Sequence, residues 1–421
     1  PTLSVAQGGE TMSRGTKSKT VLKLVILAIA LQEVGGGAVA PALADIMAAN
    51  PTVAPTTILL IQTMPYAAAI FMAPIYGAIS RKIKKRTLAL TAIATFIVFG
   101  AAPFFLSGSI PVIIFCRAMF GVAIGVLVPM AVGLCTDFFE GKERASMIGL
   151  VQAVACIGGM IFQTAGGYLC TISWNCCFLI YLISIPVLIF AYLALPEPQY
   201  AANEEEEAQK AEIAKLSFKE KFPPIVWLFY LEVIVFMITI LILVNNIAIF
   251  ITMEGWGGSI EAGYALGLHS LFGFIGGLIF APFTRVFKKW TVAVAILLAA
   301  GCFALMWFAQ NYFMAAAGCA LVGMIPSLVI CGTWNNISNT VAPAFATIAV
   351  SFCVSAQYIG QFIQPYFSDV VNSIFGLGLG RDGFMVATAT CLVLFVVLVI
   401  QSALMKEPEA KRATAVLAQE S

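Results

Sequence analysis

Two ionisable side chains lie inside long apolar stretches of this sequence, where a charge is costly to bury. Glu33 lies about 14 residues from either end of the stretch 20–47, and Arg117 lies about seven residues into the stretch 110–136. A carboxyl at that depth in a membrane can bind a proton from one side and release it to the other. A guanidinium stays charged there and needs a carboxylate, carbonyls, water or an anionic substrate. We expect Glu33 to handle protons or substrate; the alternative is a static partner of a buried cation.

Further polar side chains recur at helical spacing in other apolar stretches. Gln357, Gln361 and Gln364 follow an i, i+4, i+7 pattern that puts three amides on one face of a helix. We expect this face to line a cavity, with hydrogen bonding between helices as the alternative. Gln62 and Tyr66 form a similar i, i+4 pair. The remaining candidate residues for substrate or proton binding are Gln32, Glu232 and the single histidine, His269, for which a hydrogen-bonded packing role is the alternative.

The stretches that carry these residues are long enough to cross a membrane. The chain has 421 residues, of which 61% are hydrophobic and 10% are charged, against about 25% charged in a soluble protein. Roughly 20 apolar residues span the hydrocarbon core as a helix, and these stretches lack the alternation of barrel strands. We therefore expect an all-α membrane protein with twelve transmembrane helices. They are predicted at 20–47, 56–80, 87–107, 110–136, 145–171, 174–195, 224–252, 261–284, 290–309, 312–335, 344–371 and 383–404.

The basic residues predict how the chain is oriented in the bilayer. All 23 Lys and Arg except Arg117 and Arg381 fall on one side of the predicted membrane. The positive-inside rule makes that side the cytoplasm. Both termini are then cytoplasmic, and the basic loops are orientation signals rather than a nucleic-acid site. We expect a multi-pass protein of the cytoplasmic membrane, in contact with the lipid bilayer.

One hydrophilic stretch divides the predicted helices into two sets of six. Residues 80–87 align without gaps on residues 284–291, and each segment joins the second and third helices of its half. A repeat of this kind is typical of secondary transporters, whose substrate site lies between the halves. The predicted domains are a disordered cytoplasmic N-terminus at 1–19, an N-terminal six-helix bundle at 20–196, a cytoplasmic linker at 197–222, a C-terminal six-helix bundle at 223–405 and a cytoplasmic tail at 406–421.

Two short motifs carry a resemblance to a known family. Gly77 is followed by a basic run from Arg81 to Arg86, and Arg117 opens an R-x-x-x-G-x-x-x-G pattern. With twelve predicted helices in two repeated halves, these motifs resemble those of the Major Facilitator Superfamily. The resemblance implies a cytoplasmic latch and makes the helices of Glu33 and Arg117 neighbours, so that Glu33 is a candidate partner of Arg117. The latch residues implied are Gly77, Arg81, Arg86, Asp137 and Arg144.

The resemblance implies a secondary active transporter that works by alternating access on a small organic substrate. The sequence has no G-x-x-x-x-G-K-[ST] phosphate-binding loop and no H-E-x-x-H or G-x-S-x-G motif. We therefore expect a monomeric, proton-coupled transporter rather than an enzyme, without cofactor or metal ion. Glu33 and the Arg117 motif favour efflux by substrate/proton antiport. Arg117 also supports the alternative, which is proton-coupled uptake or exchange of an organic anion.

Overall fold

The computed structural model describes residues 19–80, 82–139, 141–197, 223–341 and 346–404, and the regular structure within these ranges is helical. In the N-terminal half, a helix at 19–30 is followed by the 3-10 helix η1 and by further helices. Their bounds are η1 Gly35–Ala42, α2 Leu43–Ala49, α3 Pro55–Ile79, α4 Lys85–Phe105, α5 Ile110–Phe138, α6 Gly141–Leu169, η2 Trp174–Ser184 and α7 Ile185–Ala194.

The described part of the C-terminal half contains six long helices and one short 3-10 turn. Their bounds are α10 Pro224–Met253, α11 Ser259–Phe287, η3 Lys288–Trp290, α12 Thr291–Trp307, α13 Tyr312–Thr340, α14 Ala346–Phe375 and α15 Arg381–Leu404. The predicted N-terminal segment 1–19, linker 197–222 and tail 406–421 lie outside the described residues, except for residues 19 and 197.

Ten helical segments among the described residues are long and apolar enough to cross a membrane. One of them, Ser259–Trp307, contains both α11 and α12, which are joined by η3. The long helix α14 is not among the ten, because glutamines and other polar residues interrupt its apolar sequence. The chain is thus a multi-pass helical membrane protein.

The helix predicted at 174–195 starts as a 3-10 helix and becomes α-helical only at Ile185. Proline at position 186 has no N–H to donate to the carbonyl of Leu182, as an α-helix would require. The N–H of Ile185 instead donates to that carbonyl from three residues away. The proline thus places the change of helix type in the middle of this element.

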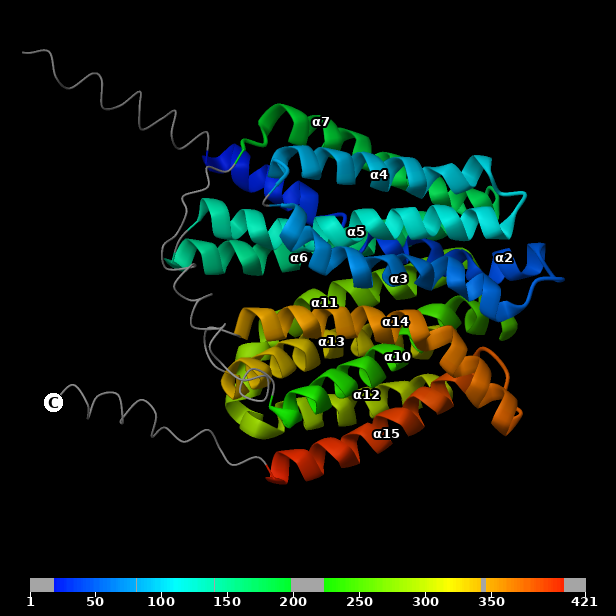
Figure 1. Ribbon diagram of the computed structural model, residues 1–421. Coiled ribbons are helices and arrows are strands. Elements are labelled where there is room, and N and C mark those ends of the chain that lie inside the picture. The colour runs from blue at the N-terminus through cyan, green and yellow to red at the C-terminus, as the bar shows by residue number, and fades with distance from the viewer. Residues whose placement is uncertain (1–18, 81, 140, 198–222, 342–345, 405–421) are drawn as a thin grey trace, which may run out of the picture.

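Two buried apolar clusters lie in the two halves of the chain. One contains residues between Val25 and Leu195 together with Ile249, and the other contains residues between Val226 and Leu398 together with Ala40. The helices α3 to α7 form one group in Figure 1, and α10 to α15 form the other. The groups meet where α3 packs on α14 and where α6 packs on α11.

Candidate functional site

The first helix is interrupted next to Glu33. After residue 30, the backbone N–H groups of Gln32, Glu33, Gly35 and Gly37 donate to carbonyls three residues earlier, at N···O distances of 3.0–3.1 Å. Glycine is unfavourable in an α-helix, and three consecutive glycines follow Glu33 and Val34. A 3-10 stretch inside a longer helix often marks a functional hinge. The first helix is therefore irregular from the carboxyl of interest onward.

Arg117 is held by neutral oxygens rather than by Glu33. Its Nε donates to the carbonyl of Ile61 at 2.8 Å, its Nη2 to the carbonyl of Gly36 at 2.9 Å and its Nη1 to the hydroxyl of Tyr181 at 2.8 Å. The side chain is 0% exposed. The expected pairing of Arg117 with Glu33 is therefore wrong: carbonyls can satisfy a buried guanidinium, and the glycine backbone brings one within reach.

Glu33 lies beside buried amides that lack hydrogen-bond partners. The carbonyls of Gly36 and Ile61 both bind Arg117, so the first helix and α3 run side by side at this level. Gln32 is one turn from Gly36 and is 1% exposed, while Gln62 adjoins Ile61 and is 0% exposed. Oε1 of Glu33 and both polar atoms of Gln32 have no partner among the described residues, and the Gln62 amide lies beside the Tyr66 hydroxyl without an aligned hydrogen bond.

Such atoms are costly, since each buried polar group without a partner destabilises the protein by about 1–3 kcal/mol. Unpaired groups of this kind need an explanation such as water, an ion or a ligand. The arrangement can therefore bind a proton at the carboxyl and a polar molecule at the amides.

The two halves meet at a pair of tyrosines near Glu33. Tyr66 on α3 and Tyr358 on α14 stack with ring centroids 6.1 Å apart and an interplanar angle of 17°. Glu33 is close enough to Tyr358, to Cys135 of α5 and to Cys156 of α6 to interact with them electrostatically. The carboxyl therefore lies at the boundary between the halves. Tyr66 is a predicted site residue.

The three glutamines of α14 have different surroundings. Gln364 is 0% exposed; its carbonyl accepts a hydrogen bond from Asn245 of α10, and its Nε2 donates to the hydroxyl of Ser368 at 2.8 Å. Gln361 contacts a methionine sulfur of α10 at 3.8 Å. Gln357, which adjoins the stacked tyrosine, has an unpartnered Nε2. Hydrogen bonding between helices thus accounts for Gln364, whereas Gln357 lies beside the tyrosine pair near Glu33.

Glu232 and His269 make their contacts within the C-terminal half. Glu232 is 4% exposed; it lies beside the amide of Gln401 on α15, and its Oε1 has no aligned partner. Nδ1 of His269 lies 3.1 Å from the carbonyl of Cys319 on α13. The histidine contact matches the packing role named as its alternative. Neither residue is joined by a described contact to the group around Glu33.

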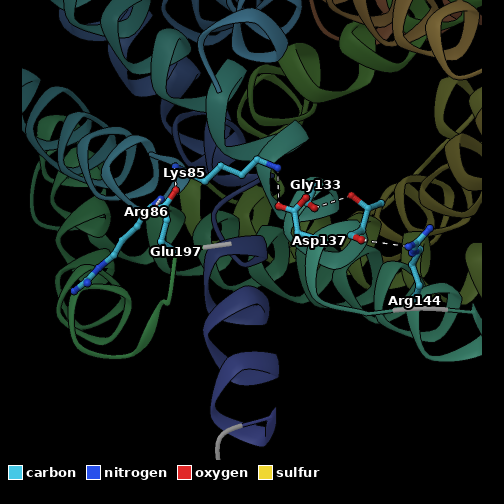
Figure 2. A network of polar contacts seen from close by, with 7 residues as sticks. Lys85, Arg86, Gly133, Asp137, Arg144 and Glu197 are labelled. Carbon is cyan, nitrogen blue, oxygen red and sulfur yellow. Dashed lines mark hydrogen bonds and ion pairs between the residues drawn. The ribbon is translucent and has the colours of Figure 1, made fainter. Parts of the chain in front are cut away.

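A polar network joins the start of α4 to the end of α5 (Figure 2). Nζ of Lys85 forms an ion pair with Oδ2 of Asp137 at 2.6 Å. The carboxylate of Glu197 accepts hydrogen bonds from the backbone N–H groups of Lys85 at 2.8 Å and Arg86 at 3.0 Å. A carboxylate is favourable at a helix N-terminus, where N–H groups are free. Glu197 thus ties the end of the N-terminal half to α4.

Of the predicted latch residues, Arg86, Asp137 and Arg144 belong to this region. Nε of Arg144 donates to the carbonyl of Phe139 at 2.8 Å, which covers the C-terminal end of α5. Gly77 lies in α3, and Arg81 lies outside the described residues. The contacts join parts of the N-terminal half, so a latch between the halves stays a prediction.

Sequence reasoning missed three residues that organise these sites. Lys85 belongs to the basic run but was not distinguished from its neighbours, and Glu197 was assigned to the linker. Tyr181 gave no signal, because a tyrosine in an apolar stretch is ordinary. Its partner Arg117 is 64 residues away, and only a structure reveals such a pair.

Polar contacts of α11 with α6 and with α2 join the two halves. The hydroxyl of Ser270 on α11 donates to Oε1 of Gln163 on α6 at 2.8 Å. The hydroxyl of Ser259, at the start of α11, bonds the carboxylate of Asp45 on α2. The halves are therefore closed against each other along this line.

Comparison with known proteins gives one family match. The family described as Major Facilitator Superfamily matches residues 25–365. The chain is similar to the 3-(3-hydroxy-phenyl)propionate transporter of Escherichia coli (strain K12), with 22% identity over 322 residues, or 74% of this chain and 76% of that protein. It is also 26% identical over 121 residues to the multidrug transporter protein MdtP of Bacillus subtilis (strain 168), covering 28% of this chain and 22% of that protein.

Solved structures of transporters share the fold. A D-xylose-proton symporter has a TM-score of 0.73 at 14% identity and covers 93% of this chain and 98% of its own. An inward-facing, unoccupied bacterial homologue of the human lysosomal transporter Spinster has a TM-score of 0.70 at 16% identity, covering 92% of this chain and 96% of its own. At these identities the likeness concerns the fold alone.

Proposed function

The chain belongs to the Major Facilitator Superfamily, a family of transporters rather than enzymes, and from this premise we propose that it exchanges a small organic molecule for protons by alternating access. In this proposal Glu33 binds the proton, and the amides of Gln32 and Gln62 contact the substrate. One observation carries the proposal: Glu33 and both amides hold buried polar atoms without an aligned hydrogen bond near the boundary between the halves.

The engagement of Arg117 favours exchange over the uptake of an anion. Its guanidinium is sealed at 0% exposure and bonded to three neutral oxygens. Among the described residues, Glu33 is then the ionisable group beside the amides of Gln32 and Gln62. A carboxylate can accept either a proton or a cationic or hydrogen-bond-donating substrate, and competition between the two couples their movements in opposite directions.

Proton-coupled transport of an organic anion is the second candidate. The observation that favours it is the similarity to a transporter whose name specifies an aromatic carboxylate, 3-(3-hydroxy-phenyl)propionate, over 74% of this chain. In that case the positive charge of Arg117 would attract the anion electrostatically, without direct contact. The two candidates predict opposite directions of proton movement.

Proteoliposomes that contain a trapped pH dye separate the two candidates. We would add tetraphenylphosphonium, an aromatic cation, or 3-(3-hydroxyphenyl)propionate to the outside and record the internal pH. Antiport makes the interior more alkaline as the cation enters, whereas symport makes it more acidic as the anion enters. Acidification by the carboxylate, with no response to the cation, would reject antiport in favour of the second candidate.

The variant Glu33→Gln tests the role of the carboxyl directly. We expect it to lose pH-driven transport while it is still expressed and inserted. Glutamine keeps the shape of the side chain, but its amide does not bind and release a proton near neutral pH. Glu254→Gln is the matched control, since Glu254 lies at the end of α10 in an ion pair with Arg381. Full pH-driven transport by Glu33→Gln would remove Glu33 from the mechanism.

For the whole chain we propose twelve membrane crossings in two six-helix bundles, with both termini in the cytoplasm. We also propose that the protein works as a monomer in the cytoplasmic membrane. Six long helices follow residue 223, and the basic residues gather on one side of the predicted array. These features support the proposal through the positive-inside rule.

A further inference from the structure

Tyr181 reaches from η2 to the interrupted part of the first helix. Its hydroxyl accepts a hydrogen bond from Nη1 of Arg117 at 2.8 Å and donates one to the carbonyl of Gly35 at 3.0 Å. Arg117 in turn donates to the carbonyl of Gly36 at 2.9 Å. Two consecutive carbonyls of η1 are therefore held by one pair of side chains. Both side chains are 0% exposed.

Close packing fixes the position of the tyrosine ring. The ring lies against Phe120 and Phe96, with centroids 4.8 and 5.4 Å away. A Cβ on Gly100 of α4 would lie 2.6 Å from the ring, so glycine is needed there for the ring to fit. The guanidinium also lies 4.5 Å from the centroid of Phe120, in favourable cation–π range. The hydroxyl therefore has little freedom to move away from Gly35.

We propose that Tyr181 is a positioning residue for Glu33, and that it acts with Arg117 as a clamp on the interrupted first helix. Glu33 is two residues before Gly35, within the turn that the clamp adjoins. This inference rests on the proposed function, because it assigns Tyr181 to the proton site of that proposal. It gives Arg117 a role in holding the helix, in place of direct contact with substrate.

The physical reason is the weakness of the helix at this point. Glycine residues 35–37 leave the backbone flexible, and bonds between residues three apart are less well aligned than those of an α-helix. Side-chain hydrogen bonds to the carbonyls supply a restraint that the sequence of the first helix lacks. Loss of the restraint would let the Glu33 carboxyl change its surroundings, and its proton affinity would change with them.

Infrared spectroscopy of the purified full-length protein tests this without knowledge of the substrate. The carboxyl C=O stretching band is recorded while the pH is varied, and the part that disappears in Glu33→Gln belongs to Glu33. In Tyr181→Phe the midpoint of this band is expected to shift by about half a pH unit or more, a measurable change in proton affinity. Phenylalanine keeps the packed ring and removes both hydrogen bonds of the hydroxyl.

The matched control is Tyr230→Phe, which removes a buried hydroxyl that donates to the carbonyl of Ala349 at 2.8 Å in the other half. It is expected to leave the midpoint unchanged. Arg117→Lys keeps the charge and loses the planar fork, so it is expected to shift the midpoint as well, and it serves if Tyr181→Phe does not fold. An unchanged midpoint in a folded clamp variant overturns the inference.

The failure of this inference differs from the failure of the proposed function. If Glu33→Gln removes no titrating part of the wild-type band, Glu33 is not the proton site and the proposed function fails. If that part titrates normally and Tyr181→Phe leaves its midpoint in place, only the positioning role is rejected.

Discussion

At the scale of single residues, Glu33 and Arg117 reach different solutions to the same problem. Both are ionisable groups in apolar helices, and both were candidate residues for the substrate or proton site. The guanidinium has three neutral oxygen acceptors and is sealed. The carboxyl keeps an unpartnered oxygen beside unpartnered amides. A group in which each nitrogen has a hydrogen-bond acceptor is suited to holding structure, and one with an unpartnered oxygen is suited to binding.

A residue-scale prediction concerns the ion pair of Lys23 with Glu143 in the first turn of α6, with 2.6 Å between Nζ and Oε1. The hydrogen bond from Lys23 holds the pKa of Glu143 below its ordinary value of 4.5. A carboxyl with a lowered pKa stabilises the folded state above that value, and the contribution is lost as the pH falls through the lowered pKa.

Glu143→Gln should therefore lower the melting temperature slightly at pH near 7, since exposed pairs contribute little. The difference from wild type should vanish in acid, well below the ordinary carboxyl pKa. Thermal unfolding in detergent at both pH values checks this. An equal difference at both would show that the ion pair is not its cause.

At the scale of elements, one of the two main contacts between the halves depends on how closely α6 approaches α11. A Cβ on Gly167 of α6 would lie 2.3 Å from the carbonyl oxygen of Ser259, which is backbone and cannot turn aside. Small residues allow membrane helices to pack at such distances. The interface between the halves on this side is therefore set by a residue without a side chain.

Gly167→Leu should force the C-terminal end of α6 and the start of α11 apart and favour a state open on that side. Distances between spin labels on these two helix ends, measured by pulsed electron resonance, should lengthen. The control is Gly149→Leu on the same helix, because a Cβ on Gly149 would meet nothing within 4 Å. Identical distance distributions in the two variants would contradict the prediction.

At the scale of the whole molecule, each half has its own buried apolar cluster, and two main helix contacts join the halves. This arrangement would allow each half to move as a unit. The apolar clusters include residues from one half each, apart from Ile249 and Ala40. The contacts α3 with α14 and α6 with α11 lie between them. Movement of one half against the other would leave each core intact, which keeps the energetic cost of alternating access low.

The orientation of the whole chain can be tested with reporter fusions. Green fluorescent protein fused after residue 421 should fluoresce, because the C-terminus is predicted to be cytoplasmic. Alkaline phosphatase, which is active only outside the cytoplasm, should be active when fused in the turn near Ser109 and inactive near residue 210. The opposite pattern would reverse the predicted orientation.

The sequence by itself determined the membrane class, the helix positions to within a few residues and the family. These follow from local quantities, since an apolar stretch of about 20 residues must form a helix in lipid. It also drew attention to Glu33, because a carboxyl in such a stretch is rare. The interruption beside it could be expected from the three glycines.

The tertiary structure alone decided which polar groups meet. Arg117 binds Gly36 and Tyr181 rather than Glu33. Gln364 is hydrogen-bonded to Asn245, whereas Nε2 of Gln357 on the same helix has no partner among the described residues. Such pairings depend on which faces of distant helices turn toward each other. In lipid that choice is set by packing between helices rather than by hydrophobicity, because burying an apolar face against protein instead of lipid gains little hydrophobic free energy.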